Sequence, residues 1–217
     1  MDNQLLEHLL SFLTDRRKNL FDEVISKRTR HFTVATEDVY QLHNTSAVMR
    51  SCDVFGIQDL HVIEEKVSKK IDREIAMGAQ KWVNIDRHHS TKECIDNLKE
   101  NGYQIIATTP HNNSTELKDF DISKKSAFFF GKEKEGLSDI VLEAADGYLK
   151  IPMYGFTESL NISVSAAIIL QTLITKVKDS DVVWELSELE KNEIKLQWAK
   201  MSIKSSTEII ERFNKTN

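Results

Sequence analysis

The sequence predicts an α/β protein of three layers, in which helices cover both faces of a mostly parallel sheet. Short β-rich runs alternate with helical patterns through the middle of the chain. The 217 residues are 40% apolar and 29% charged, which fits one globular domain with helical extensions. Glycine (7) and proline (2) are scarce, so the connections should be short and no linker is expected.

The chain opens with an amphipathic segment, which we interpret as an N-terminal helical arm over residues 1–30. Between residues 3 and 27, apolar residues recur at helical spacing with charged residues between them. The apolar positions are Leu5, Leu6, Leu9, Leu10, Leu13, Leu20, Phe21, Val24 and Ile25.

From His31 the pattern changes to alternating strands and helices, which define a predicted domain over residues 31–178. β-rich runs predict strands over residues 31–35, 59–63, 81–85, 104–108, 126–130 and 147–151. Helices are expected over residues 43–55, 70–78, 91–101, 137–145 and 160–178. Asn101-Gly102 is a typical helix stop. Parallel sheets bind ligands beyond the carboxyl ends of their strands, so the functional site is expected there.

A second amphipathic pattern, over residues 182–213, predicts a C-terminal helical extension spanning residues 179–217. It contains Trp184 and Trp198 among many charged residues. Packing of these rings in a core is the simpler expectation, and packing against a second subunit is the alternative.

Cysteine usage and the absence of long apolar runs predict a soluble, cytoplasmic protein without a membrane span. Cys52 and Cys94 lie in expected helices and form no disulfide framework. No run of about 18 apolar residues occurs, and no secretory leader is recognisable.

The charge distribution is uneven. The net charge is −5, yet residues 16–31 carry +4 and residues 191–215 carry +3. On charge alone, solvated helix faces are the simpler interpretation. The alternative is a phosphate-contacting surface on an acidic body.

A glycine-flanked loop follows the strand predicted at 126–130. Gly131-Lys132-Glu133-Lys134-Glu135-Gly136 lacks the Gly-Lys-Ser/Thr of a phosphate loop, and its two glutamates would repel a polyphosphate. The loop suits a ligand with an amino group, a ribose or an adenine edge, because glycine permits close backbone approach and carboxylates accept hydrogen bonds. A solvated loop is the simpler interpretation of this segment taken alone.

Two further segments place polar residues beside apolar helices. In residues 43–56, Asn44 has the character of an N-cap, and Arg50 is flanked by apolar positions, with a surface salt bridge as the simpler role. In residues 151–165, Ser159, Asn161 and Ser163 precede the apolar run 166–170. No cluster demands a metal, and the adjacent pair His88-His89 is expected to face solvent.

Taken together, these three segments resemble the three motifs of the SpoU-type (SPOUT) RNA ribose 2'-O-methyltransferases. The matching residues are His43-Asn44, Ser46-Ala47, Arg50, Asp53 and Phe55-Gly56, then Phe130 to Glu133 and Gly136-Leu137, then Ile151 to Met153 and Ser159 to Val164. The resemblance covers roughly residues 30–178. Within this family the chain is most similar to the bacterial enzymes that methylate guanosine 18, a D-loop residue, of tRNA.

The resemblance implies a fold and a chemistry. The C-terminal part of the sheet is expected to form a deep trefoil knot, a rare exception to the rule against knotted chains. S-adenosylmethionine is expected as the cofactor and tRNA as the substrate. A homodimer is expected, with an active site that draws on both subunits.

The resemblance also assigns roles to single residues. Thr108, Gly131, Ile151 and Leu160 match positions that frame the cofactor, and Arg50 matches the catalytic arginine. Asn44, Glu133 and Asn161 are the other polar positions of the catalytic group, with Ser159 and Ser163 in secondary roles. We expect tRNA backbone contacts from Arg28, Arg30, Arg16, Arg17 and Lys18.

Two alternatives stay open at the level of sequence. Ribosomal RNA is an alternative substrate, although many relatives that act on it carry an additional N-terminal RNA-binding domain that a 30-residue arm is too short to provide. A non-catalytic RNA-binding knot protein is an alternative from another class. Such a protein would be expected to lack the polar motif residues.

Overall fold

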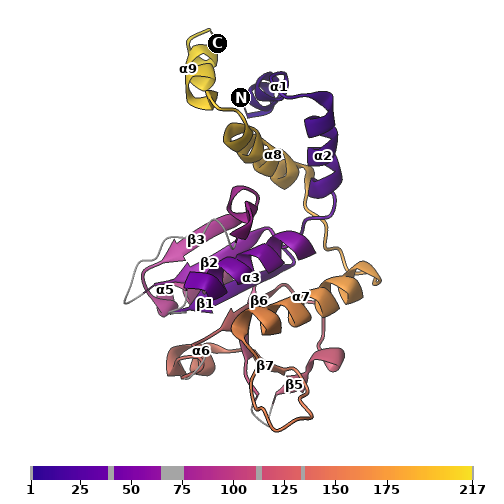
Figure 1. Ribbon diagram of the computed structural model, residues 1–217, viewed down its shortest axis with the longest axis vertical. Helices are drawn as coiled ribbons and strands as arrows, with labels where there is room; N and C mark the ends of the chain where they lie inside the picture. The colour runs from indigo at the N-terminus through magenta and orange to yellow at the C-terminus, as the bar shows by residue number, and fades with distance from the viewer. Residues whose placement is uncertain (1, 39–41, 65–75, 111–113, 133–134, 217) are drawn as a thin grey trace. The chain divides into compact units, whose positions relative to one another are not determined.

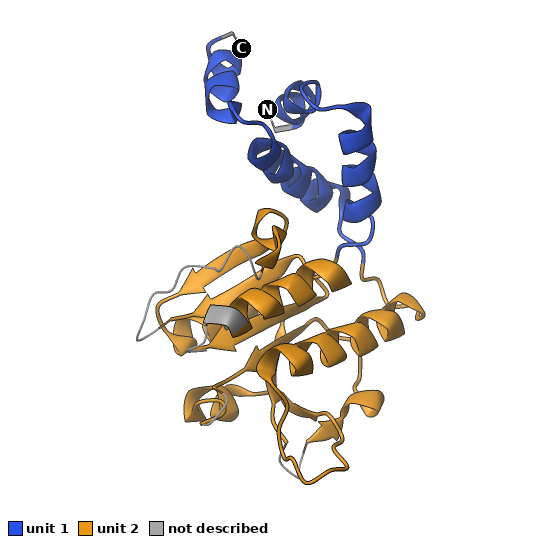
Figure 2. Cartoon of the chain, in the orientation of Figure 1, with its two compact units in different colours: residues 1–28, 185–217 blue, residues 29–184 orange. Residues whose placement is uncertain are grey.

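The computed structural model describes residues 2–38, 42–64, 76–110, 114–132 and 135–216. The chain forms two compact units, one of residues 29–184 and one of residues 1–28 together with 185–217 (Figure 2). None of the described helices is long and apolar enough to cross a membrane.

The larger unit is built on a parallel sheet, as predicted. Its described residues form seven strands in the order β3-β2-β1-β6-β4-β7-β5, and every pairing is parallel (Figure 1). The strands are β1 Phe32–Glu37, β2 Asp59–Ile63, β3 Asn84–His88, β4 Gln104–Thr108, β5 Thr115–Glu116, β6 Ser126–Phe130 and β7 Gly147–Lys150.

Helices cover both faces of this sheet, which confirms the three-layer α/β prediction. One core packs α3 (Leu42–Phe55) and α7 (Ile162–Lys178) against one face, with Phe128 of β6 among its buried residues. The other core packs α5 (Thr91–Glu100) and α6 (Asp139–Ala144) against the opposite face, with Phe129 among its residues. Successive strand side chains point to opposite faces, so the continuous apolar run of β6 serves both cores.

Several predicted boundaries agree with the structure. The strands expected at 59–63, 104–108 and 126–130 have these bounds, and α5 ends immediately before Asn101 and Gly102, whose φ is +80°. Cys52 and Cys94 are buried in α3 and α5 respectively, and no disulfide joins them.

Several other bounds differ from the prediction by one or two residues. The largest difference, of three residues at β3, is explained by local hydrogen bonding. The strand expected at 81–85 begins only at Asn84, because the 3₁₀ turn η1 (Ala79–Lys81) holds the preceding residues: Trp82 and Val83 both donate their amides to the carbonyl of Ala79. The structure also contains β5 and the 3₁₀ turn η2 (Leu117–Asp119), in a segment for which no strand or helix was predicted. Most of the helix expected at 70–78 lies outside the described residues.

The smaller unit contains four helices among its described residues: α1 Asp2–Leu10, α2 Asp15–Ile25, α8 Glu188–Ser202 and α9 Ser206–Thr216. The expected continuous arm is broken at Thr14, whose hydroxyl accepts a hydrogen bond from Arg17 N and caps α2. Likewise Ser187 and Glu190 form a capping box that starts α8.

The N- and C-terminal extensions form this unit together. The rings of Phe21 and Trp198 meet edge to face with centroids 5.4 Å apart, and the Arg28 guanidinium lies over Trp198 at 5.5 Å. Lys195 and Asp22 form an ion pair at 2.9 Å. The expectation that Trp198 packs in a core is confirmed, since it is buried.

Candidate active site

The carboxyl ends of β4, β6 and β7 surround a cavity of about 450 Å³. The four residues predicted to frame the cofactor, Thr108, Gly131, Ile151 and Leu160, all line it, and Ser159 does too. The other lining residues are Thr109, Pro110, Phe130, Lys132, Glu135, Gly136, Leu137, Leu142, Leu149, Lys150, Met153, Glu158, Ile162 and Ser165. The site therefore lies at the edge of the sheet where parallel topology predicted it.

The loop after β6 forms one wall through a close approach of two backbone segments. Lys132 N donates to the Gly136 carbonyl at 3.0 Å, and Gly136 N donates to the Lys132 carbonyl at 2.9 Å. A Cβ at Gly131 would lie 2.3 Å from backbone atoms of Gly136, so residue 131 must be glycine in this conformation. Gly136 has φ +72°, a conformation that also favours glycine. Glu133, a predicted catalytic residue, lies outside the described residues.

Lys132 lines the cavity, although the sequence assigned it no role of its own within its motif. Its ammonium forms an ion pair with Glu135 at 3.0 Å and lies 3.9 Å from an oxygen of Asp38. A lysine within a charged loop reads as solvated, and the sequence carries no signal that Asp38, almost a hundred residues away, faces it.

The buried carboxylate of Glu37 fixes the end of this loop. It accepts hydrogen bonds from the Ser138 amide at 2.8 Å, from the Ser138 hydroxyl at 2.6 Å and from the Thr91 hydroxyl at 2.6 Å. These contacts join the end of β1 to the start of α5 and the N-cap of α6.

Asn161 lies next to the cavity-lining residues Leu160 and Ile162, where the segment after β7 turns into α7. Its Oδ1 caps the helix, accepting hydrogen bonds from Ser163 N at 2.8 Å and Ser163 Oγ at 2.6 Å. Its Nδ2 donates to Oδ1 of Asn44 at 3.1 Å. The structure thus brings together three predicted site residues from two motifs. Asn44 is not an N-cap, because α3 already begins at Leu42.

Arg50 lies in a second hollow, of about 440 Å³, between α3 and α7. Ser163 lines this hollow as well, so the start of α7 separates it from the first cavity. Arg50 is exposed, and its guanidinium has no hydrogen bond or ion pair within the described parts of the chain. The remaining residues of the hollow are Ala47, Ser51, Val54, Phe55, Val164, Ala167 and Ile168.

Some of the side chains predicted to contact RNA are exposed, whereas others interact with partners inside the protein. Arg16 and Arg17 on α2 are exposed, and Lys18 pairs with Asp15 at 3.0 Å. Arg28 is 2% exposed and stacked on Trp198, so the prediction that it contacts tRNA phosphates does not fit its burial.

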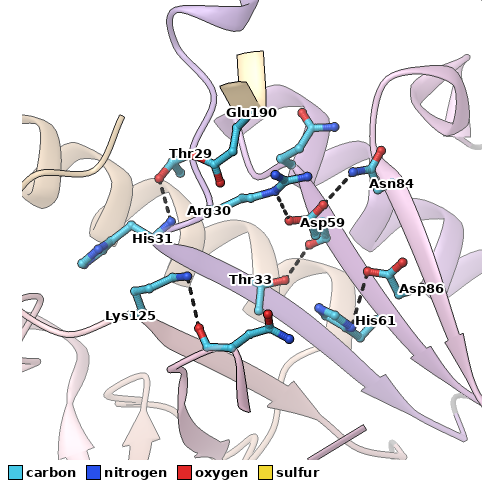
Figure 3. A network of polar contacts seen from close by, with 12 residues as sticks. Thr29, Arg30, His31, Thr33, Asp59, His61, Asn84, Asp86, Lys125 and Glu190 are labelled. Carbon is cyan, nitrogen blue, oxygen red and sulfur yellow. Dashed lines mark hydrogen bonds and ion pairs between the residues drawn. The ribbon is translucent and has the colours of Figure 1, made fainter. Parts of the chain in front are cut away.

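Arg30 is likewise engaged within the fold. Its Nε donates to Asp59 at 2.8 Å, and the same carboxylate accepts a hydrogen bond from Asn84 at 2.7 Å (Figure 3). This network ties β1 to β2 and β3, which favours a structural role over the predicted phosphate contact.

The expectation that both His88 and His89 face solvent was half wrong. His89 is exposed, whereas His88 is buried beneath α5 and lies 3.1 Å from His61, ring nitrogen to ring nitrogen. The register of β3 on β2 pairs His88 with Ile63, the last residue of β2, which turns this imidazole inward.

An open parallel sheet, helices on both faces and a cavity at the carboxyl ends of central strands define a cofactor-binding α/β enzyme class. The family model for the SpoU rRNA methylase family matches residues 31–171. The chain therefore belongs to this family.

Individual relatives match more of the chain than the family model does. The chain is 38% identical over 208 residues to a tRNA (guanosine(18)-2'-O)-methyltransferase of Borreliella burgdorferi, covering 94% of this chain and 95% of that one. It is similar to the crystal structure of the Aquifex aeolicus TrmH/SpoU tRNA modifying enzyme, with TM-score 0.79 and 32% identity. The match covers 87% of this chain and 98% of that chain. A Streptomyces viridochromogenes SpoU methyltransferase, solved with AdoMet, shares the fold with TM-score 0.62 and 22% identity. The match covers 73% of this chain and 62% of that chain.

We predict that Gly131→Ala will open the loop after β6, because the added Cβ overlaps the backbone of Gly136. Overpacking of this kind costs about 1–3 kcal/mol in the free energy of unfolding. Hydrogen exchange should show faster exchange of the Lys132 and Gly136 amides. Gly155→Ala is the matched control, since the nearest atom to its Cβ is 4.0 Å away. Unchanged exchange at both amides would contradict the tight loop.

Proposed function

We propose that this chain is an S-adenosylmethionine-dependent methyltransferase that modifies the ribose 2'-hydroxyl of guanosine 18 in tRNA. The observation that carries the proposal is the near full-length similarity to an enzyme named for that reaction. The cavity lined by residues of two matching motifs supports it. This substrate also fits the cytoplasmic location expected from the sequence.

The cavity suits the cofactor in size and chemistry. Its volume of about 450 Å³ is within the usual range for small-molecule sites, roughly 300–1,000 Å³. Leu137, Leu149 and Leu160 offer apolar walls for an adenosine, while Lys132 and Glu158 offer charges for an amino-acid group. Thr108, Gly131, Ile151 and Leu160 would hold the cofactor, which supplies an activated methyl group on a sulfonium sulfur.

The segments that line the cavity also fit the trefoil knot implied by the family resemblance. They comprise the loop after β6 and the stretch from β7 to α7, both within the C-terminal part of the sheet. Threading one of these segments through the other would hold irregular backbone in a fixed shape around a ligand. We include the knot in the proposal on this basis.

In the proposed mechanism, Arg50 acts as a clamp rather than as a base. A guanidinium stays protonated far above neutral pH, so it cannot readily accept the proton of the 2'-hydroxyl. Its exposed fork can bind the phosphate beside the target ribose and stabilise negative charge developing on the 2'-oxygen. The proton then leaves to water or to the phosphate.

The other polar residues position this arrangement. Asn161 holds the start of α7 and, through Asn44, connects it to the helix that carries Arg50. Ser163 lies beside Arg50, and Ser159 lies in the cofactor cavity, which fits secondary positioning roles. Glu133 keeps its predicted role as a catalytic-group residue.

A homodimer would complete the site. The hollow that holds Arg50 is rimmed by exposed apolar side chains from two helices, Val54, Val164 and Ile168. Apolar side chains clustered beside a functional arginine are typical of an interface. A second copy of the chain packed there would exclude water from Arg50 and bring two active sites together.

The domain roles follow from the same proposal. Residues 31–178 would form the knotted methyltransferase domain, and the extensions over residues 1–30 and 179–217 would bind tRNA. The exposed Arg16 and Arg17 on α2, with Lys18 beside them, would contact the phosphate backbone.

The decisive experiment is mass-spectrometric mapping of ribose methylation after incubation with labelled cofactor and either tRNA or ribosomal RNA. We expect one modified site, guanosine 18 of tRNA, and no label on a tRNA whose residue 18 lacks the 2'-hydroxyl. Label on ribosomal RNA alone would favour the alternative substrate. RNA binding without any label would favour the non-catalytic protein.

Arg50→Ala should lower the single-turnover rate of methyl transfer by about 10²–10³-fold, as expected for loss of a charge-stabilising donor. Cofactor binding should be nearly unchanged, because Arg50 does not line the cofactor cavity. Arg50→Lys should rescue only partly, since an ammonium lacks the planar fork. Arg87→Ala, which removes an arginine from β3, is the control. A near wild-type rate for Arg50→Ala with saturating tRNA would refute the clamp.

Reversing charge at Arg16 and Arg17 should weaken tRNA binding and reduce its salt dependence. Each lost phosphate contact lowers the slope of log K against log salt by about 1. The matched control is reversal of Lys99 and Lys124, two exposed lysines near the amino ends of β4 and β6. If both double variants show the same slope, α2 is not part of the RNA interface.

Val54→Asp combined with Ile168→Asp should separate the dimer, because a buried interface would have to desolvate two new carboxylates. Sedimentation should then report one chain of 25.0 kDa instead of two. Ile140→Asp, which places the same charge on an exposed apolar position of α6, should stay dimeric. A wild-type chain that sediments as a monomer would overturn this part of the proposal.

A further inference from the structure

Three metal-ligand side chains meet away from the proposed active site, beneath α5. They are His61 of β2, His88 of β3 and Cys94 of α5, and all three are buried. One ligand atom from each lies within 4.8 Å of the others. Nδ1 of His61 and Nε2 of His88 are 3.1 Å apart, so one ring donates to the other. The proposed methyl transfer uses none of them.

The donor set suits a borderline-soft cation. Two imidazole nitrogens with one thiolate are typical zinc ligands, at about 2.0–2.1 Å for nitrogen and 2.3 Å for sulfur. Tetrahedral bonds of these lengths separate ligand atoms by roughly 3.3–3.6 Å. The two nitrogens, 3.1 Å apart, are close to this value, and the Cys94 sulfur lies within 4.8 Å of both, so side-chain rotations would be needed to complete the geometry.

We propose that His61, His88 and Cys94 bind one Zn²⁺ ion through Nδ1, Nε2 and Sγ. Asp86 would supply the fourth ligand after a rotation of its side chain, since its carboxylate lies 3.8 Å from Nδ1 of His61 but outside the cluster of three. Its side chain is 52% exposed, which gives the ion a route into the site. The charges of the thiolate and the carboxylate then balance that of the ion.

Burial favours a cation site at the histidines and opposes it at the cysteine. Burial lowers the pKa of both histidines, which keeps their lone pairs available at neutral pH. Burial raises the pKa of the Cys94 thiol, so the thiol stays protonated until a cation displaces its proton to solvent. The proton in the hydrogen bond between the two imidazoles would move, through solvent, to a ring nitrogen that does not bind the ion.

The ion would have a structural role. It would join β2, β3 and α5, three elements at one edge of the sheet. Thr91, in the first turn of α5, bonds to Glu37, and Glu37 bonds to Ser138 at the end of the cavity loop. Zinc bound at Cys94 would therefore hold α5 in place. Because Thr91 of α5 helps to position Glu37, the ion would also stabilise the loop that Glu37 holds.

The test is a titration of chelator-treated, full-length protein with Co²⁺, which reports a sulfur ligand through a thiolate charge-transfer band. We expect one Co²⁺ per chain with this band, and displacement by an equal amount of Zn²⁺. His88→Gln and Cys94→Ser should weaken binding by at least about 100-fold, because each removes one of few ligands. Asp86→Asn should weaken it less.

Matched controls keep the test decisive. Cys52→Ser changes the other buried cysteine, and His89→Gln changes the exposed neighbour of His88; both should bind like wild type. The chain has two cysteines, so the band in Cys52→Ser assigns it to Cys94 even if Cys94→Ser fails to fold. Absence of the band in wild type, or equal binding by His88→Gln and wild type, would overturn the proposal.

Discussion

The carboxamide of Asn161 joins the two parts of the site. Its oxygen caps α7, and its nitrogen bonds to Asn44 inside the first turn of α3. One side chain thereby contacts both the start of α7, which borders the cavity at the carboxyl ends of the strands, and the helix that carries Arg50. An amide suits this task because it offers an acceptor and a donor at once, whereas a carboxylate would only accept.

The cavity wall formed by the loop after β6 depends on a steric constraint. Gly131 and Gly136 let two backbone segments approach more closely than any side chain would permit, and Glu37 holds the end of the same loop with three hydrogen bonds. Rigid walls of this kind, built from backbone contacts, fit a pocket that must recognise a small molecule without much charge.

The sequence predicted the architecture well because strands and helices are encoded by local patterns of apolar residues. Strands such as Ser126–Phe130 are continuous apolar runs, and their ends mark the site edge whatever the details of packing. The four residues expected to frame a cofactor line one cavity for the same reason. Their roles were assigned by family resemblance, which periodicity could not have supplied.

Sequence patterns say least about side chains whose partners are remote in sequence. Arg30 is held by Asp59, and Arg28 by Trp198, so a basic run that reads as an RNA surface is partly structural. His88 reads as exposed until the register of β3 on β2 is known. Lys132 faces Asp38 only because β6 lies beside β1. Each depends on tertiary pairing that no local pattern encodes.

The helical unit has a consequence for the order of folding. Its contacts join Phe21 to Trp198 and Asp22 to Lys195, pairs separated by more than 170 positions. These contacts cannot form until the ribosome has made residue 198, by which time every strand of the sheet has been synthesised. Long-range contacts also close slowly. Helix α2 thus acquires its packed partner only after every strand has been synthesised, so a chain that ends just before α8 would contain the whole sheet before it could assemble this unit.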